Sequence, residues 1–360
     1  MAQAVMGSLS RFSSTMRRSI TSQTRNYASR TAIPTFTPTS SPELDKLLDR
    51  FRNDRFIPAG LPKRQRQSMF KEKHAQRLTE EPITVKISEN EEYTFRPMKI
   101  TETPTKRDAF AALQLMMSMN EWKNLLPFLS GLHAAGFRIG QDRWEQLVRR
   151  AGAAGKLSLI LECARQGSHT GLHLRSMGVV RSLFYQIHLA AEQAGYKGDA
   201  VTKAFNTTRQ AVDLMDQDPV LQEIGAKAEN VKHQPFVIGT LLELSASRAI
   251  NEFGAKDETN EVLNYARKLV ASWSYFSKEV ATEDRHEAVK RIQELAPVYN
   301  GLRQSLSIHG LAVDKDLHSA VTTCLAEAKE TLQKQVDAFS PEAQKQTKAY
   351  FDLAQSLLSA

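Results

Sequence analysis

The chain is poor in cysteine, with Cys163 and Cys324 as the only two in 360 residues. They stand far apart and form no CxxC pair, which excludes a disulfide framework and a thiolate zinc cluster and indicates a compartment that keeps thiols reduced. Long apolar runs are also missing. The most continuous one, residues 236–242, ends at Glu243, far short of the ~20 residues that a membrane-spanning helix requires. We therefore expect no membrane span.

Acidic residues are absent from the first 42 positions, where five arginines lie scattered among serine, threonine and alanine. An arginine-rich, serine-rich and acid-poor start is typical of a mitochondrial transit peptide. Residues 25–27, Arg-Asn-Tyr, stand before an alanine and resemble the sites cleaved by the matrix processing peptidase. We predict a transit peptide over residues 1–27 and a location in the mitochondrial matrix. An ordinary basic tail is the alternative.

Positive charge is concentrated in residues 50–77, which we call the basic segment. It holds nine basic side chains against two acidic ones, whereas residues 78–360 hold 33 basic and 35 acidic side chains. The nine candidate RNA-binding residues are Arg50, Arg52, Arg55, Lys63, Arg64, Arg66, Lys71, Lys73 and Arg77. The positive potential of the chain beyond the transit peptide therefore belongs mainly to this segment.

The basic segment also contains Phe51, Phe56 and Phe70, and residues 57–62 carry two prolines that should interrupt any continuous helix. An extended arm of this composition can lay guanidinium groups on phosphates and aromatic rings on unstacked bases. We predict a basic N-terminal arm that binds RNA. The alternative is a solvated charged face on two short helices.

Capping residues and periodicity predict a mainly α fold. A helix should begin after Ser41 and run to about residue 52, a second should occupy residues 62–78, and residues 83–87 and 93–97 alternate as a small β-hairpin. Everything after residue 105 is expected to be helical. We divide the chain beyond the transit peptide into a basic extension (28–104), a helical repeat region (105–196) and a C-terminal helical region (197–360).

Two copies of one layout lie 35 residues apart. Expected helices 107–119 and 122–135 are matched by 142–154 and 157–166. This period, with two antiparallel helices per unit, resembles pentatricopeptide and tetratricopeptide repeats, and the resemblance implies an α-solenoid of stacked helical hairpins.

The repeats depart from the pentatricopeptide pattern at the position that reads a base, which is Phe110 in the first copy and Glu145 in the second. Phenylalanine cannot form a hydrogen bond with a base, and glutamate repels phosphate. We therefore expect a packing scaffold rather than a base-reading code, with Trp122, Trp144 and Trp273 as large core fillers.

Together, the presequence, the basic arm and the non-reading repeats resemble lineage-specific helical-repeat subunits of fungal mitochondrial ribosomes. The resemblance implies a structural component of the mitochondrial ribosome whose partners are ribosomal RNA and mitochondrial ribosomal proteins. We prefer the large particle over the small one. The alternative is a matrix factor for RNA processing, translation activation or assembly of a respiratory complex.

Catalytic motifs are not found. Residues 152–158 look like a phosphate loop, but Leu157 stands where a serine or threonine would bind magnesium. His169 and His173 have a metal-ligand spacing with Cys163 nearby, but Gly171 between them indicates a loop. We expect no enzymatic activity, no cofactor, no metal and no small-molecule substrate.

Overall fold

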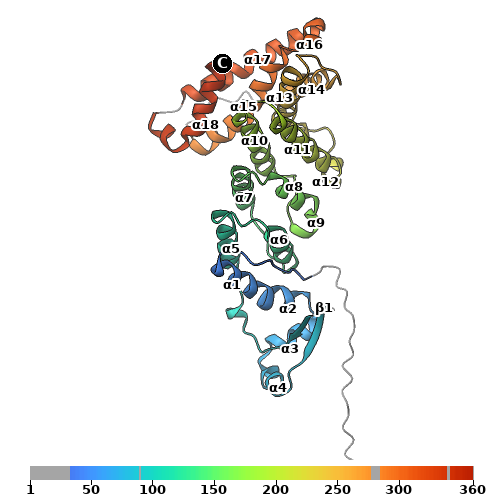
Figure 1. The fold of residues 1–360 in the computed structure, drawn as a ribbon, viewed down its shortest axis with the longest axis vertical. Coiled ribbons are helices and arrows are strands. Elements are labelled where there is room, and N and C mark those ends of the chain that lie inside the picture. Colours follow the sequence, from blue (N-terminus) through green and yellow to red (C-terminus); the bar gives the residue numbers. More distant parts are fainter. Residues whose placement is uncertain (1–32, 89–90, 277–283, 339–340, 360) are drawn as a thin grey trace, which may run out of the picture. The chain divides into compact units, whose positions relative to one another are not determined.

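The computed structural model describes residues 33–88, 91–276, 284–338 and 341–359. It is mainly helical with one small antiparallel hairpin, which confirms the predicted class (Figure 1). The elements are α1 (Pro42–Phe51), α2 (Ile57–Gly60), α3 (Lys63–Phe70), α4 (Ala75–Glu80), β1 (Thr84–Ser88), β2 (Glu91–Thr94), α5 (Lys106–Ser118), α6 (Leu125–Ala134), α7 (Gln141–Ala153), α8 (Leu157–Arg165), α9 (Gly167–Thr170), α10 (Met177–Gln193), α11 (Asp199–Asp216), α12 (Pro219–Ile224), α13 (Pro235–Glu252), α14 (Glu261–Ala271), α15 (Arg285–Ser305), α16 (His309–Val313), α17 (Lys315–Asp337) and α18 (Pro341–Ser359). None of the helices in these described ranges is long and apolar enough to cross a membrane.

The chain divides into two compact units, and the smaller one includes residues 62–101. Its strands β1 and β2 pair in antiparallel fashion, with Val85 opposite Tyr93, so the predicted hairpin is confirmed. The buried side chains of this unit include Met69, Leu78 and Phe95. The Phe95 N–H donates to the carbonyl of Ile83 at 2.8 Å, which extends the hairpin ladder beyond the strands. The two helices α3 and α4 and the end of the hairpin thus each contribute a buried apolar side chain.

The larger unit comprises residues 33–61 and 102–360 and begins with the helix that Ser41 caps. We expected the first helix to end near residue 52 and the prolines to interrupt any continuation, but the helical path continues through Pro58. It passes through a π-helical turn, in which the Ile57 N–H bonds to the carbonyl of Arg52, and ends at Gly60. Proline has no N–H to donate, and a widened turn just before it can absorb the missing bond. The helical path therefore extends about eight residues beyond the predicted end near residue 52, and it ends within the predicted interruption at residues 57–62.

Helices α5 to α11 form stacked pairs in two layers. Helices α5, α7 and α10 pack in succession, and α6, α8 and α11 follow beside them (Figure 1). The first two pairs are the two predicted copies. Helix α6 begins at Leu125 rather than residue 122, so Trp122 lies in the turn before it, although its side chain is still buried. The third pair was not predicted, because α10 and α11 lie on either side of the boundary that we drew between residues 196 and 197.

Helix α13 is the centre of the C-terminal part of the larger unit. It packs against α10, α11, α14 and α15, and its side chains are buried almost without interruption from Pro235 to Ser247. Helices α13 and α15 approach closely where Gly239 lies against Val298 and Gly301 lies against the Gly239 carbonyl. Helix α17 packs on α15, and its buried residues, Cys324 among them, recur at three- and four-residue spacing.

A buried polar network joins α10, α13 and α15. The Nδ1 atom of His188 lies 2.9 Å from both carboxylate oxygens of Glu243, and both side chains are fully buried. The hydroxyl of Tyr196 donates to the same carboxylate at 2.8 Å, and the amide of Asn300 donates to it at 2.5 Å. Burial and the neighbouring Glu243 carboxylate raise the pKa of Tyr196, so its hydroxyl keeps its proton. Side chains from three parts of the chain are therefore linked through one carboxylate, that of Glu243.

Candidate nucleic-acid interface

The nine predicted RNA-binding residues divide between the two units. Three arginines lie in the larger unit and hold neighbouring segments of the same chain. Arg50 donates to the carbonyl of Glu102 at 2.8 Å, and Arg52 donates to the carbonyl of Pro34 at 2.9 Å. Arg55 donates to the hydroxyl of Thr103 at 3.3 Å. These three guanidinium groups serve internal contacts, a role that the charge count alone could not distinguish from RNA binding.

Arg52 helps to fix the chain that leads into α1. Residues 33–41 lie against α6, where the ring of Phe36 packs at 6.2 Å from that of Phe128. The buried amide of Asn124 accepts from the Thr37 N–H at 2.9 Å and donates to the Thr37 carbonyl at 2.7 Å. The side chain of Asn124 thus pairs with the backbone as a neighbouring strand would. This segment belongs to the core of the larger unit.

The other six predicted residues lie on or next to α3 and α4 in the small unit, and all six are exposed: Lys63, Arg64, Arg66, Lys71, Lys73 and Arg77. Helix α3 has no acidic residue in its first turn. Arg77 has Glu81 at 3.9 Å, but both side chains are highly exposed, and an exposed pair of this kind contributes little. The six cations present a basic surface on short helices, which we call the α3–α4 surface.

The expectation of an extended arm is therefore corrected. The segment folds into short helices on which Met69 and Leu78 are buried, and the Met98 N–H, just beyond the hairpin, donates to the carbonyl of Met69 at 2.9 Å. A charged face on short helices, the alternative considered from the sequence, describes the geometry of these residues.

The expected stacking of aromatic rings on bases is wrong for two of the three phenylalanines. Phe51 is fully buried and Phe56 is 3% exposed, and both rings pack against Phe128. The ring of Phe51 meets that of Phe128 edge-on at 5.2 Å. Phe70 is half-buried in the small unit. The apolar spacing of α1 could have revealed this, because Leu44, Leu48 and Phe51 share one helical face.

The charge count made from the sequence missed a second basic region. Residues 106–181 contain 11 basic and 5 acidic side chains, whereas residues 182–360 contain 19 basic and 24 acidic ones. Averaging from residue 78 to the end concealed this contrast, and a count in shorter windows would have found it. The positive charge of the larger unit therefore belongs to its first helical pairs.

Cations and one aromatic ring come together on α5 and α7, which we call the α5–α7 surface. The guanidinium carbon of Arg143 lies 5.1 Å from the centre of the Phe110 ring, and the Nζ atom of Lys106 lies 5.6 Å from it. Arg107 and Arg150 are exposed on the same two helices. Phe110, which cannot read a base edge, instead carries two cations beside its half-buried ring.

One acidic side chain at the start of α5 already has hydrogen-bond partners. Asp108 accepts a hydrogen bond from the Thr105 N–H at 2.7 Å and closes a capping box at the start of α5. That backbone hydrogen bond is the main reason why the pKa of Asp108 lies below its usual value, and the charges of Arg50 and Arg107 add to it. The carboxylate therefore stabilises the helix end and remains charged near neutral pH.

The motifs considered for metal or phosphate binding are turns. Gly155, at a φ of +67°, forms the turn between α7 and α8, and Gly171, at a φ of +78°, separates the two histidines. Burial raises the pKa of the Cys163 thiol to about 12, which disfavours the thiolate that a metal needs. Within the described parts of the chain, no three His, Cys, Asp or Glu side chains are arranged to hold a metal ion.

Comparison with known proteins identifies the family. The family model of the mitochondrial ribosomal protein mS27 matches residues 18–355. A relative from Neurospora crassa, the small ribosomal subunit protein mS27, is 27% identical over 259 residues. The alignment covers 67% of this chain and 65% of the relative, which is just under two thirds of the relative's length. The relative is named for the small subunit, so the preference for the large particle finds no support.

The family match covers both the basic segment and the helical body. Proteins of this family are mitochondrial, are parts of a ribonucleoprotein that carries out translation, and have a structural rather than an enzymatic role. The predicted mitochondrial ribosomal character is confirmed at that level, while the resemblance to pentatricopeptide and tetratricopeptide repeats is not. From the match over residues 18–355, this chain belongs to the mitochondrial ribosomal protein mS27 family.

Proposed function

We propose that this protein is a structural component of the small subunit of the mitochondrial ribosome and works in the mitochondrial matrix. It contacts ribosomal RNA through the α3–α4 surface and neighbouring ribosomal proteins through its helical body. The name of the Neurospora relative supports the small particle. The stacked pairs α5 to α11 support a pentatricopeptide-like or tetratricopeptide-like scaffold, in which Phe110 and Glu145 do not read bases.

The observation that carries the RNA contact is the exposure of the six cations on the α3–α4 surface. Among the residues that the structure describes, one of the six cations forms an ion pair, and this pair, Arg77 with Glu81, is long. Cations without close carboxylates can take phosphates without first breaking an internal pair. Each phosphate contact releases bound counterions from the RNA, which supplies most of the free energy of such binding. The contribution from Arg50, Arg52 and Arg55 is smaller, because they already hold backbone and hydroxyl groups.

A quadruple variant tests this proposal. Replacing Arg64, Arg66, Lys71 and Lys73 by glutamine should weaken binding to fragments of the small-subunit ribosomal RNA. The logarithm of affinity should also fall less steeply with the logarithm of salt, by ~0.7–0.9 for each phosphate that the variant no longer neutralises. Because these side chains are exposed, the free energy of unfolding should change by ~0.5 kcal/mol or less for each.

The matched control changes the same amount of charge elsewhere. Lys203, Lys227, Lys315 and Lys329 are exposed and lie in the acidic part of the chain. Their replacement by glutamine should leave both affinity and salt slope near those of the wild type. Equal effects of the two quadruple variants would show that only net charge matters and would remove the α3–α4 surface from the proposal.

Sedimentation tests whether the protein is a resident subunit or a transient factor. We expect the chain to remain with the small subunit in a gradient of mitochondrial lysate at high salt. A factor for RNA processing, translation activation or complex assembly would leave the particle under those conditions. Sedimentation with the large particle would contradict the assignment to the small one.

A further inference from the structure

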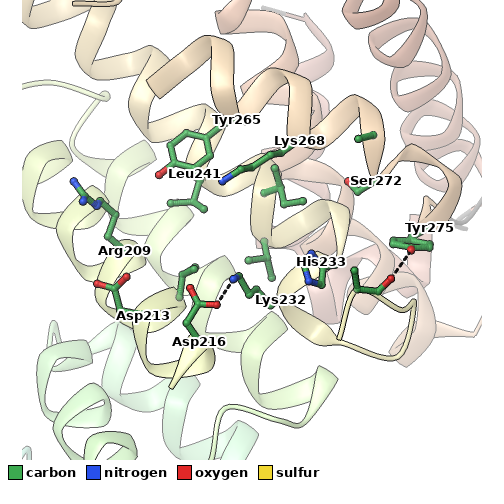
Figure 2. A pocket seen from close by; sticks show the side chains of 15 residues that line it. Arg209, Asp213, Asp216, Lys232, His233, Leu241, Tyr265, Lys268, Ser272 and Tyr275 are labelled. Atoms are coloured by element: carbon green, nitrogen blue, oxygen red, sulfur yellow. Dashed lines mark hydrogen bonds and ion pairs between the residues drawn. The ribbon is translucent and has the colours of Figure 1, made fainter. Parts of the chain in front are cut away.

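A hollow of about 500 Å³ lies in the acidic C-terminal part of the larger unit, away from the residues considered so far. Helices α11 and α14 both pack on α13, and residues of all three line the hollow. Figure 2 shows Arg209, Asp213 and Asp216 of α11 on one side and Tyr265 and Lys268 of α14 on the other. The hollow is a groove with α13 as its floor.

The floor of the groove is apolar. Val237, Ile238 and Leu241 of α13 contribute to it, together with Val212 of α11. The rings of two tyrosines stand above this floor, and Tyr265 is half-buried there. An apolar floor with tyrosines at its edge is the composition at which protein interfaces concentrate their binding energy.

Both ends of the groove are closed by interactions within the chain. At one end, Arg209 donates to Glu261 at 3.4 Å and joins α11 to α14. At the other, the hydroxyl of Tyr275 donates to the carbonyl of Ala226 at 3.2 Å, as Figure 2 shows. The volume of about 500 Å³ lies within the range of concave sites that enclose a drug-sized group, which is comparable in size to a few side chains. The occupant is therefore short.

The charges at the rim are not all neutralised. Lys232 forms an ion pair with Asp216, and Arg209 has Glu261 as its partner. The ammonium group of Lys268 lies 5.7 Å from the Tyr265 ring and forms no ion pair or hydrogen bond with the described residues. Lys268 is exposed, and so is Asp213 across the groove. The arrangement leaves a cation on the α14 side and a carboxylate on the α11 side.

His233 adds a neutral polar group to the lining of the groove. Burial is the main cause that lowers the pKa of His233, and the charge of Lys232 adds to it. The imidazole is therefore uncharged near neutral pH and can both donate and accept a hydrogen bond.

We propose that this groove docks a short segment of a neighbouring small-subunit protein, with an apolar residue on the α13 floor and an acidic residue beside it at Lys268. Charge favours a protein over RNA as the occupant, because residues 182–360 carry 19 basic against 24 acidic side chains. This inference rests on the proposed function, since the ribosomal particle supplies the neighbour.

Site-specific crosslinking in the assembled particle tests the docking. A photoreactive benzoylphenylalanine in place of Tyr265 keeps an aromatic group in the groove, and the same residue in place of exposed Asn264 serves as the control. After illumination and purification of small subunits, we expect a crosslink from position 265 to one protein segment that contains an apolar residue close to an acid. The crosslink should survive ribonuclease treatment and should be absent from position 264.

A charge reversal tests the pairing with Lys268. In the benzoylphenylalanine-265 background, Lys268→Glu should lower the crosslink yield roughly tenfold or more. The new carboxylate at position 268 would repel the acidic residue of the docked segment. Changing the acid of the crosslinked partner segment to lysine should restore the yield. Lys256→Glu, at an exposed position outside the groove, should leave the yield unchanged. Unchanged circular dichroism of each variant separates a failure to dock from a failure to fold.

Several outcomes would overturn the inference while the chain still sediments with the small subunit. They are a crosslink that ribonuclease removes, a crosslink to a second copy of this chain, no crosslink from position 265, and a yield indifferent to Lys268→Glu. Loss of the chain from the small subunit would instead overturn the proposed function, and the docking with it. Sedimentation and crosslinking therefore report separately on the two claims.

Discussion

At the scale of single residues, the carboxylate of Glu243 is the centre of the buried polar network. This carboxylate is fully buried, and groups on His188, Tyr196 and Asn300 converge on it. Burying a charge is tolerable only when such partners replace the water that it loses. A buried network of this kind is strongly stabilising as a whole and fragile towards the loss of one member.

Removing the Glu243 carboxylate should therefore be costly. We expect Glu243→Gln to lower the free energy of unfolding by ~3–5 kcal/mol, because an amide nitrogen would face groups that need an acceptor. Glu258→Gln, at an exposed site, should change it by ~0.5 kcal/mol or less. Denaturant titration of both variants measures the difference. Equal stabilities would show that the network is not formed in solution.

The sequence showed Glu243 only as the end of an apolar run. Its partners lie 47 to 57 residues away along the chain, and no local pattern records such a distance. Cys324 was easier to predict, because its burial follows from the three- and four-residue spacing of one helix. Local periodicity reveals which face is buried but not which polar groups meet there.

At the scale of elements, the close crossing of α13 and α15 depends on two glycines. A Cβ atom added to Gly239 would lie 2.8 Å from the Cα atom of Val298, and one added to Gly301 would lie 2.7 Å from the Gly239 carbonyl oxygen. Both contacts involve backbone, which cannot move aside like a flexible side chain. Pro297 inside α15 stands next to this crossing.

We expect Gly239→Ala or Gly301→Ala to lower the free energy of unfolding by ~1–3 kcal/mol through overpacking. Gly140→Ala is the matched control, since a Cβ atom there meets nothing within 4 Å and its φ of −73° suits any residue. Thermal unfolding of the three variants distinguishes the cases. A melting temperature unchanged by Gly301→Ala would show that the helices lie further apart.

The capping box of α5 gives a prediction that depends on pH. Asp108→Asn should cost ~1 kcal/mol at pH 7, because the charged carboxylate bonds to the Thr105 N–H. The folded-state pKa of Asp108 is lowered, so its stabilisation is present above the unfolded pKa of ~4 and is lost as the pH falls through the folded value. The difference between variant and wild type should shrink below pH ~4.

Asp142→Asn is the control for this prediction, since Asp142 is exposed in the first turn of α7. Its substitution should change stability by ~0.5 kcal/mol or less at either pH. Denaturant midpoints at pH 7 and pH 3 provide the comparison. An effect of Asp108→Asn of the same size at both pH values would show that the charge of the carboxylate does not contribute to the cap.

Element boundaries followed from the sequence wherever a cap or a clear period marked them. Ser41, predicted to precede the first helix, accepts the Leu44 N–H and caps α1. We did not predict that the helix continues through Pro58, because we expected proline to end it. The widened turn before Pro58 allows the helix to continue. The basic segment was misjudged as extended because its few apolar residues bury themselves against a hairpin that lies later in the chain.

At the scale of the whole molecule, positive charge lies on two surfaces, one in each unit. If both touch RNA, their contributions to the salt dependence should add. We expect replacement of Lys106, Arg107, Arg143 and Arg150 by glutamine to reduce the slope further when combined with the α3–α4 variant. A salt series with ribosomal RNA fragments measures it. A combined variant that behaves like the α3–α4 variant alone would restrict RNA contact to the small unit.

The predicted transit peptide lies outside the described residues, so it stays a prediction from composition. Membership of a mitochondrial ribosomal protein family implies a mitochondrial location, which agrees with it. We expect protein isolated from mitochondria to begin near Ala28, as determined by N-terminal peptide mass spectrometry. Mature chains that begin at Met1 would show that residues 1–27 are not removed.

The burial of α13 has a consequence for how the chain reaches its native state. Its apolar surface is covered by α10 and α11, which precede it, and by α14 and α15, which follow it. A chain that ends before Arg285 therefore leaves one side of α13 open to water and to other chains. Incomplete chains with such a surface aggregate readily. The C-terminal part should thus collapse late and in one step, and a chain entering an organelle N-terminus first would need protection until α15 arrives.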